Sequence, residues 1–221
     1  MENEYIKVWD IPIRLFHWVL VALVTSQFLI AWVFTEQIDL HVTLGYLTLA
    51  LIVFRIFWGF IGTAYAQFKN FLVSPTSLVA YTKGLFNQTS QSKSAGHNPI
   101  GGYSTIAIIV CILAQGFSGL FCDDDVFTAG PLRHLVSDNV TSIFNRVHAL
   151  NAKILVGLLC THVLAIFWYL LVKRENLIKP MITGKKIAIK YNKYMNWTEK
   201  PLAALLALAL ASIAVWVLIN I

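Results

Sequence analysis

The stretch VHALNAKILVGLLCTHVLAIFWYLLV, residues 147–172, decides the fold class of this 221-residue chain. It is longer than the roughly 20 mainly apolar residues that a helix needs to cross the hydrocarbon core of a membrane. Its basic side chains are one lysine and two histidines, Lys153, His148 and His162. Ionisable side chains inside a membrane span are costly, and by default they indicate a functional site.

Four further apolar runs are long enough to span a membrane: residues 15–34, 40–61, 100–121 and 201–221. Apolar residues make up 57% of the chain and charged residues 13%, against about 25% charged residues in a soluble domain. The sequence therefore predicts an all-α integral membrane helical bundle. We expect a four-helix core in residues 1–175, followed in residues 176–221 by a basic segment and a fifth, C-terminal transmembrane helix.

The charged residues predict the orientation of the bundle. Basic residues gather before the first span, between the second and third, and between the fourth and fifth: Lys7, Arg14, Lys69, Lys83, Lys93 and eight Lys or Arg in residues 173–200. The other connections are acidic, with Glu36 and Asp39 in one and DDD at residues 123–125 in the next. The positive-inside rule then predicts a multi-pass protein of the bacterial inner membrane with a cytoplasmic N-terminus and a periplasmic C-terminus. The same clustering makes nucleic acid a poor explanation for the net charge of +6.

Four histidines fall into two pairs at matching depths. His148 and His162 are fourteen residues apart on one predicted helix, which is roughly 21 Å along the axis and about 40° short of four full turns. They therefore share one face, with His148 nearer the periplasm. His41 begins the second span on the periplasmic side and His17 begins the first on the cytoplasmic side. The pattern pairs His41 with His148 and His17 with His162.

Two histidine pairs from facing helices are what two bis-imidazole haems need in a helical bundle. A zinc site would instead gather more ligands at one depth. We therefore predict two non-covalent b haems, an inner one on the cytoplasmic side and an outer one. Gly45 and Gly157 would let a porphyrin approach the backbone, and close helix packing is the alternative for both glycines.

Basic side chains near these histidines are candidates to bind haem propionates. Arg14 lies one turn before His17, where a positive-inside anchor is the alternative. Arg55 lies fourteen residues after His41, so it returns to the depth of the inner haem and we predict a propionate contact there. Lys153 either extends outward to the membrane surface or meets a propionate of the outer haem.

Several ordered motifs resemble the bacterial cytochrome b561 family: KVWDIPIRLFHW at 7–18, HVTLGYLTLALIVFRIFWGFIG at 41–62, GHNPIGG at 96–102, DDDVFTAGPL at 123–132 and the two histidines of the fourth span. That family includes the b-type subunits of nickel–iron hydrogenases and is similar to formate dehydrogenase membrane subunits. The resemblance covers about residues 5–175. It implies two b haems with axial ligands at His17, His41, His148 and His162, and leaves His97 and His134 as non-ligands.

The expected function is that of a membrane dihaem cytochrome. It would pass electrons between the membrane quinone pool and a periplasmic redox protein, such as a hydrogenase-type or dehydrogenase-type subunit, and it could form oligomers. One alternative is a self-sufficient quinone reductase that oxidises a diffusible one-electron donor such as superoxide. Another is a haem-free membrane anchor or transporter. Gln27, Gln115 and Ser118 are polar candidates for a quinone site, with interhelical hydrogen bonding as an equal alternative. The fifth helix would dock an accessory subunit or anchor the chain.

Overall fold

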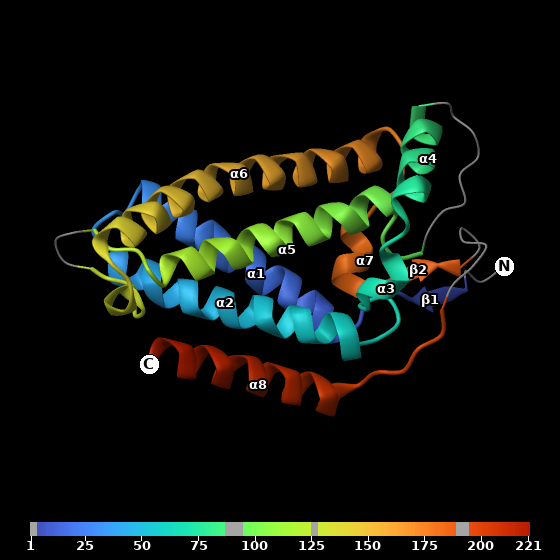
Figure 1. Cartoon of the computed structure of the whole chain (residues 1–221). Coiled ribbons are helices and arrows are strands. Elements are labelled where there is room, and N and C mark those ends of the chain that lie inside the picture. Colours follow the sequence, from blue (N-terminus) through green and yellow to red (C-terminus); the bar gives the residue numbers. More distant parts are fainter. Residues whose placement is uncertain (1–3, 87–94, 125–127, 189–194) are drawn as a thin grey trace.

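The computed structural model describes residues 4–86, 95–124, 128–188 and 195–221. Five helices in these residues are long and apolar enough to cross a membrane: α1 (Ile11–Trp32), α2 (Ile38–Ile61), α5 (Pro99–Gly119), α6 (Asp138–Leu171) and α8 (Pro201–Ile219). They run side by side along one direction (Figure 1). The predicted helical membrane bundle is confirmed. Lys93, Asp125 and residues 189–194 of the predicted basic segment lie outside the described residues.

Side-chain caps set the starts of two spans. Asp10 precedes α1, and its Oδ1 accepts a hydrogen bond of 2.7 Å from the backbone N–H of Ile13. Asn98 precedes α5, and its Oδ1 accepts one of 2.7 Å from Gly101 N–H. A proline in the first turn of each helix has its backbone angle already set for the helix. Because Arg14 is charged, a count of apolar residues starts this helix at residue 15, which is too late.

The largest difference from the sequence prediction is the length of α6. It begins at Asp138, nine residues before the apolar run at residue 147, and has 34 residues. Residues 138–146 are helical, but several of their side chains are polar. A count of apolar residues therefore does not detect these turns. Ser137 has extended backbone at the helix start, and Asp138 places an acidic side chain where the helix dipole favours it. His148 consequently lies three turns inside the helix rather than at its edge.

The helices pack in sequence order, α1 on α2, α2 on α5 and α5 on α6, and α8 packs against the outer side of α2 (Figure 1). The buried residues of α8 are Ala207, Ala211 and Val215, and small side chains of this kind let two helices approach closely. Lys200 Nζ donates to the carbonyls of Ile61 (2.9 Å) and Gly62 (3.1 Å), which joins the start of α8 to the end of α2.

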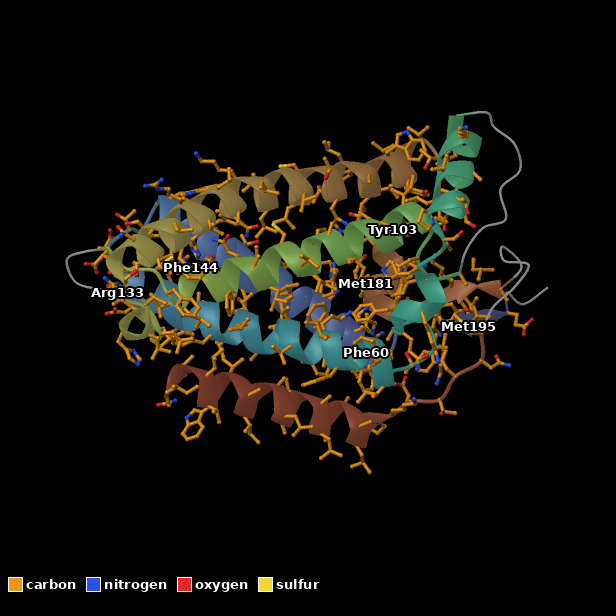
Figure 2. All side chains as sticks on the ribbon, in the orientation of Figure 1. Phe60, Tyr103, Arg133, Phe144, Met181 and Met195 are labelled. Carbon is orange, nitrogen blue, oxygen red and sulfur yellow. The ribbon has the colours of Figure 1, made fainter. Side chains whose placement is uncertain are left out.

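Short elements gather at the two ends of the bundle. The basic end, with the described N-terminal residues, holds β1 (Tyr5–Lys7), α3 (Phe68–Phe71), α4 (Pro75–Phe86), α7 (Ile178–Thr183) and β2 (Lys185–Ile187). β1 and β2 pair antiparallel. The opposite, acidic end holds residues 33–37, 120–124 and 128–136, including a 3₁₀ helix, η1 (Arg133–Leu135). Figure 2 shows Met181 and Met195 at the basic end and Arg133 and Phe144 at the acidic end. The predicted division at residue 175 stays a prediction.

Candidate functional site

The first histidine pair lies toward the acidic end. His41 is in the first turn of α2 and His148 lies on α6, and their ring centroids are 6.4 Å apart with an angle of 74° between the ring planes. A metal–imidazole bond is about 2.0–2.1 Å long, so two imidazoles on opposite sides of one metal atom place their centroids roughly 6 Å apart. Each ring can turn about its own bond, so the angle between the planes is unconstrained. The spacing therefore fits trans ligands of one iron.

Ser118 on α5 sets the tautomer of His148. Its hydroxyl donates its single proton to the carbonyl of Gln115, over 3.0 Å. The same oxygen lies 3.1 Å from His148 Nδ1, and with its own proton engaged it can accept from Nδ1, so this arrangement favours the tautomer with the ring proton on Nδ1. A neutral His148 then keeps its lone pair on Nε2, the form that binds a metal. On the other ring, His41 Nδ1 is buried beside the backbone of Gln27 but outside normal hydrogen-bond geometry.

The second pair lies toward the basic end. His17 of α1 and His162 of α6 are electrostatic neighbours. The His17 ring stands perpendicular to that of Trp18 at a centroid distance of 4.9 Å, and its Nδ1 is buried without a hydrogen-bond partner. Among the described residues, no three His, Cys, Asp or Glu side chains gather into a site for a small ion. His41 and His148 are thus in ring contact toward the acidic end, and His17 and His162 are electrostatic neighbours toward the basic end.

Two guanidinium groups near the basic end have unused donors. Arg55 is only 3% exposed, its Cζ lies 4.7 Å from the ring centroid of Phe68, and its buried Nη1 has no hydrogen-bond partner. Asp10 is nearby. However, the Asp10 carboxylate already accepts from Ile13 N–H, Trp58 Nε1 (2.9 Å) and Thr63 Oγ1 (2.6 Å).

Arg14 shows the same feature, because its Nη1 donates to a backbone carbonyl and its Nε is buried without a partner. A buried donor without a partner is costly. Both guanidiniums could therefore meet an anion.

Few residues of α6 are buried by other parts of the chain. Its only buried residues among those described are Thr141 and Leu155, and its extensive packing is against α5. Gly157 is exposed and lies nine residues after His148, so it is on the opposite side of α6, where a Cβ would meet nothing within 4 Å. A Cβ on Gly45 would meet only Gln27 Oε1, at 3.8 Å. Gly45 therefore borders open space one turn after His41, whereas Gly157 faces the outside of the bundle and not the histidines.

His97, which the resemblance leaves as a non-ligand, lies at the basic end of the bundle. Its ring lies 4.8 Å from that of Trp9 and 4.6 Å from that of Phe71. Burial lowers the pKa of His97 to about 3, with smaller contributions from the positive charges of Arg55, Lys186 and His162. The ring is therefore neutral near pH 7. The motif GHNPIGG singled out this position in the sequence without indicating the contacts of its ring.

His97 should make the protein less stable in mild acid. Its folded pKa lies below the unfolded value of about 6.5, so the unfolded chain binds the extra proton as the pH falls. Between pH 7.5 and 5, this group should cost up to about 2 kcal/mol of unfolding free energy. Thermal unfolding of the detergent-solubilised protein should show a smaller acid loss for His97→Gln than for the wild type. Equal acid losses would show that the ring is protonated without penalty.

The polar residues first considered for a quinone site have other partners. Gln27 Nε2 donates to Thr48 Oγ1 over 2.7 Å, which joins α1 to α2. Gln115 Oε1 accepts from Asn151 Nδ2 over 2.6 Å, which joins α5 to α6. Ser118 holds His148. Interhelical hydrogen bonding and ligand orientation therefore account for all three.

Two further basic side chains lie on the surface. Lys153 is exposed on α6 and His134 is exposed in η1. Of the two alternatives for Lys153, its exposure favours a side chain that extends outward to the membrane surface over one that meets a propionate.

Residues 8–184 match a known family, prokaryotic cytochrome b561. The chain belongs to this family. No curated protein matches the chain. As a b561 cytochrome it is a membrane protein that binds haem b and works in electron transfer. The residues described above fit such a group, because they offer two imidazoles in ring contact, buried guanidinium donors without partners and a glycine, Gly45, beside open space.

Proposed function

We propose that this b561 cytochrome holds two b haems, one between His41 and His148 and one between His17 and His162. The observation that carries the proposal is the 6.4 Å spacing of the His41 and His148 rings. The hydroxyl of Ser118 supports it, because it leaves His148 Nε2 available as a ligand. A b haem supplies one-electron redox chemistry when bound, and the chain supplies axial ligands, orientation and local charge.

The remaining donors of Arg14 and Arg55 bind the propionates of the haem at the basic end. Each guanidinium has a buried nitrogen without a partner, and charge-assisted hydrogen bonds to carboxylates are the strong ones. Because this end of the bundle is positive, the reduced form of its haem is stabilised. Its midpoint potential is therefore raised relative to that of the haem at the acidic end.

We further propose that the basic end faces the cytoplasm and the acidic end the periplasm, as the positive-inside rule requires. The electron path then crosses the inner membrane, between the quinone pool and a periplasmic redox protein. The acidic end contains a cleft of about 440 Å³ lined by Thr35, Glu36, Ile38, Asp39, Asp124 and Thr128. Asp39 is two residues from His41, so a redox protein with a basic face would be drawn close to this haem.

The acidic end disfavours superoxide as the electron donor. Glu36 and Asp39 are exposed there, and their charges would repel an anion approaching the His41–His148 pair. The family assignment also disfavours the haem-free alternatives. A protein partner is therefore preferred over a diffusible anionic donor.

Quinol exchange tests the proposed function directly. Purified, oxidised protein is mixed anaerobically with a short-chain ubiquinol or menaquinol, and the haem absorbance is followed. We expect at least one of the two quinols to reduce the haem, and the matching quinone to reoxidise dithionite-reduced protein. Dithionite alone serves as the control that the haem can be reduced. Protein that dithionite reduces but that exchanges electrons with neither quinone couple would contradict a quinone-linked role.

The proposed orientation predicts the side of the C-terminus. Alkaline phosphatase fused after Ile221 should be active, because the C-terminus of α8 lies at the acidic, periplasmic end. A green fluorescent reporter at the same position should stay dark. A fusion within residues 173–177, at the basic end, should give the opposite pattern. Bright fluorescence from the C-terminal fusion would overturn the orientation.

A further inference from the structure

Residues 178–188, here named the strap, cross the start of α1. Trp18 Nε1 donates to the carbonyl of Met181 over 3.2 Å, and Arg14 Nη1 donates to that of Ile182 over 3.0 Å. Figure 2 places Met181 at the basic end, on α7. The backbone N–H groups of Val8 and Trp9 both donate to Gly184 O, over 2.8 and 3.2 Å. The strap thus holds the turn of α1 that carries His17.

The strap also contacts the end of α6. Lys186 in β2 is buried, and its Nζ lies 3.4 Å from Glu175 Oε1, shortly after the last turn of that helix. The backbone N–H of Glu175 in turn donates to Tyr169 O within α6. The two helices joined in this way, α1 and α6, are those that carry His17 and His162. The strap therefore spans the two sides of the basic-end histidine pair.

Gly184 is the residue of the strap with no room for a side chain. It ends α7 with a φ of +79°, a left-handed conformation that side chains with a Cβ rarely adopt. A Cβ there would lie 2.7 Å from Trp9 O and 2.9 Å from Arg14 Nη1. A side chain at this position would displace the guanidinium or the backbone beside it.

Arg14 is the point where the strap meets the haem site. The strap carbonyl of Ile182 takes one of its donors, and its Nε remains buried without a partner one turn before His17. A guanidinium is planar, so fixing Nη1 also fixes the direction of the other donors. The geometry points to the strap as part of the basic-end haem site, with Gly184 as a positioning residue that aims Arg14 at a propionate. This inference rests on the proposed haem between His17 and His162.

A purely structural role for the strap is the alternative. The strap would then stabilise the N-terminal strand, and disturbing it would lower stability without changing the electrostatics of the haem. The midpoint potential of the basic-end haem separates these roles, because loss of a positive charge from a propionate favours the oxidised iron and lowers the potential. Coupling between Gly184 and Arg14 is measured by a double-mutant cycle.

The experiment is a spectroelectrochemical titration of purified wild type, Gly184→Ala, Arg14→Ala and the double variant, with both haem components resolved. We expect Gly184→Ala to lower the potential of the basic-end haem, as Arg14→Ala does, and to add nothing in the Arg14→Ala background. The midpoint potential of the haem held by His41 and His148 should stay unchanged. Gly184→Asn is the second variant if the alanine protein does not fold, because asparagine tolerates a left-handed backbone but still brings a Cβ toward Arg14.

Gly130→Ala is the matched control. Gly130 lies at the acidic end, and a Cβ there would also press on backbone, 2.4 Å from Leu120 O. It should leave the potential of the basic-end haem unchanged. An unchanged potential in a Gly184 variant that retains the haem would overturn the inference, and so would a shift of equal size with and without Arg14. Wild-type protein that lacks the basic-end haem would instead overturn the proposed function on which the inference rests.

Discussion

Substitution of His41 or His148 by alanine should remove or disrupt the same haem. Each substitution takes away one of two axial imidazoles whose rings lie 6.4 Å apart, and the iron left with one ligand binds more weakly in a pocket shaped for two. We expect each variant to lose about half of the b-type absorbance per chain, since two haems of one type contribute similarly. The component that remains should have the wild-type potential of the His17–His162 haem.

The substitutions His17→Ala and His162→Ala should remove the other component. His134→Ala is the control, because His134 is exposed at the acidic end and should leave both components intact. Optical redox titration of each variant provides the measurement. Loss of different components from the His41 and His148 variants would show that these two residues do not share an iron.

Arg55→Ala should lower the potential of the basic-end haem and retain both haems. The guanidinium is buried and has a free Nη1, so its charge is poorly screened by water. At an effective dielectric constant of about 20, two unit charges separated by about 8 Å interact by about 2 kcal/mol. For one electron this corresponds to roughly 90 mV, since a tenfold change in equilibrium constant is 59 mV.

Arg55→Lys is the matched variant for that prediction. It keeps a positive charge but loses the planar donor geometry, so its potential should fall between those of Arg55→Ala and the wild type. The same titration measures both variants. If neither component moves in Arg55→Ala, Arg55 does not contact a propionate and serves instead as an anchor held by Phe68 and Asp10.

The proximity of His41 and His148 could be predicted because it depends largely on properties of a single helix, and the His17–His162 pair stays a prediction. The fourteen-residue spacing of His148 and His162 and the rise of an α-helix fix their separation and their common face, whatever the neighbouring helices do. The partner histidines sit at helix starts, where the ends of apolar runs locate them. The contact between His41 and His148 follows from those depths, and the structure brings the two rings together.

The role of Ser118 could not be predicted in the same way. In the sequence, Ser118 is a polar residue in an apolar run. Such a residue could contact a quinone, form an interhelical hydrogen bond or orient a haem-binding histidine, and the sequence does not distinguish these roles. The choice depends on the rotation of α5 relative to α6, which places its hydroxyl 3.1 Å from His148 Nδ1. No local pattern determines that rotation.

The strap is the part of the fold that sequence patterns missed. Its strand has three residues and its helix six, too few to show a hydrophobic period. Its contacts join residues far apart in the chain, such as Arg14 with Ile182 and Val8 with Gly184. The basic composition of residues 173–200 predicted a surface segment, and the buried side chain of Lys186 within it depends on those distant partners.

Haem content per chain is the measurement that tests the central claim most directly. The pyridine haemochrome assay on purified protein, with the chain quantified by amino-acid analysis, should give two non-covalent haem b per chain. The Ser118→Ala variant should bind the His41–His148 haem more weakly, because it frees the proton on His148 Nδ1 from its acceptor. A value of one haem per chain, or a c-type spectrum, would contradict the two-pair account.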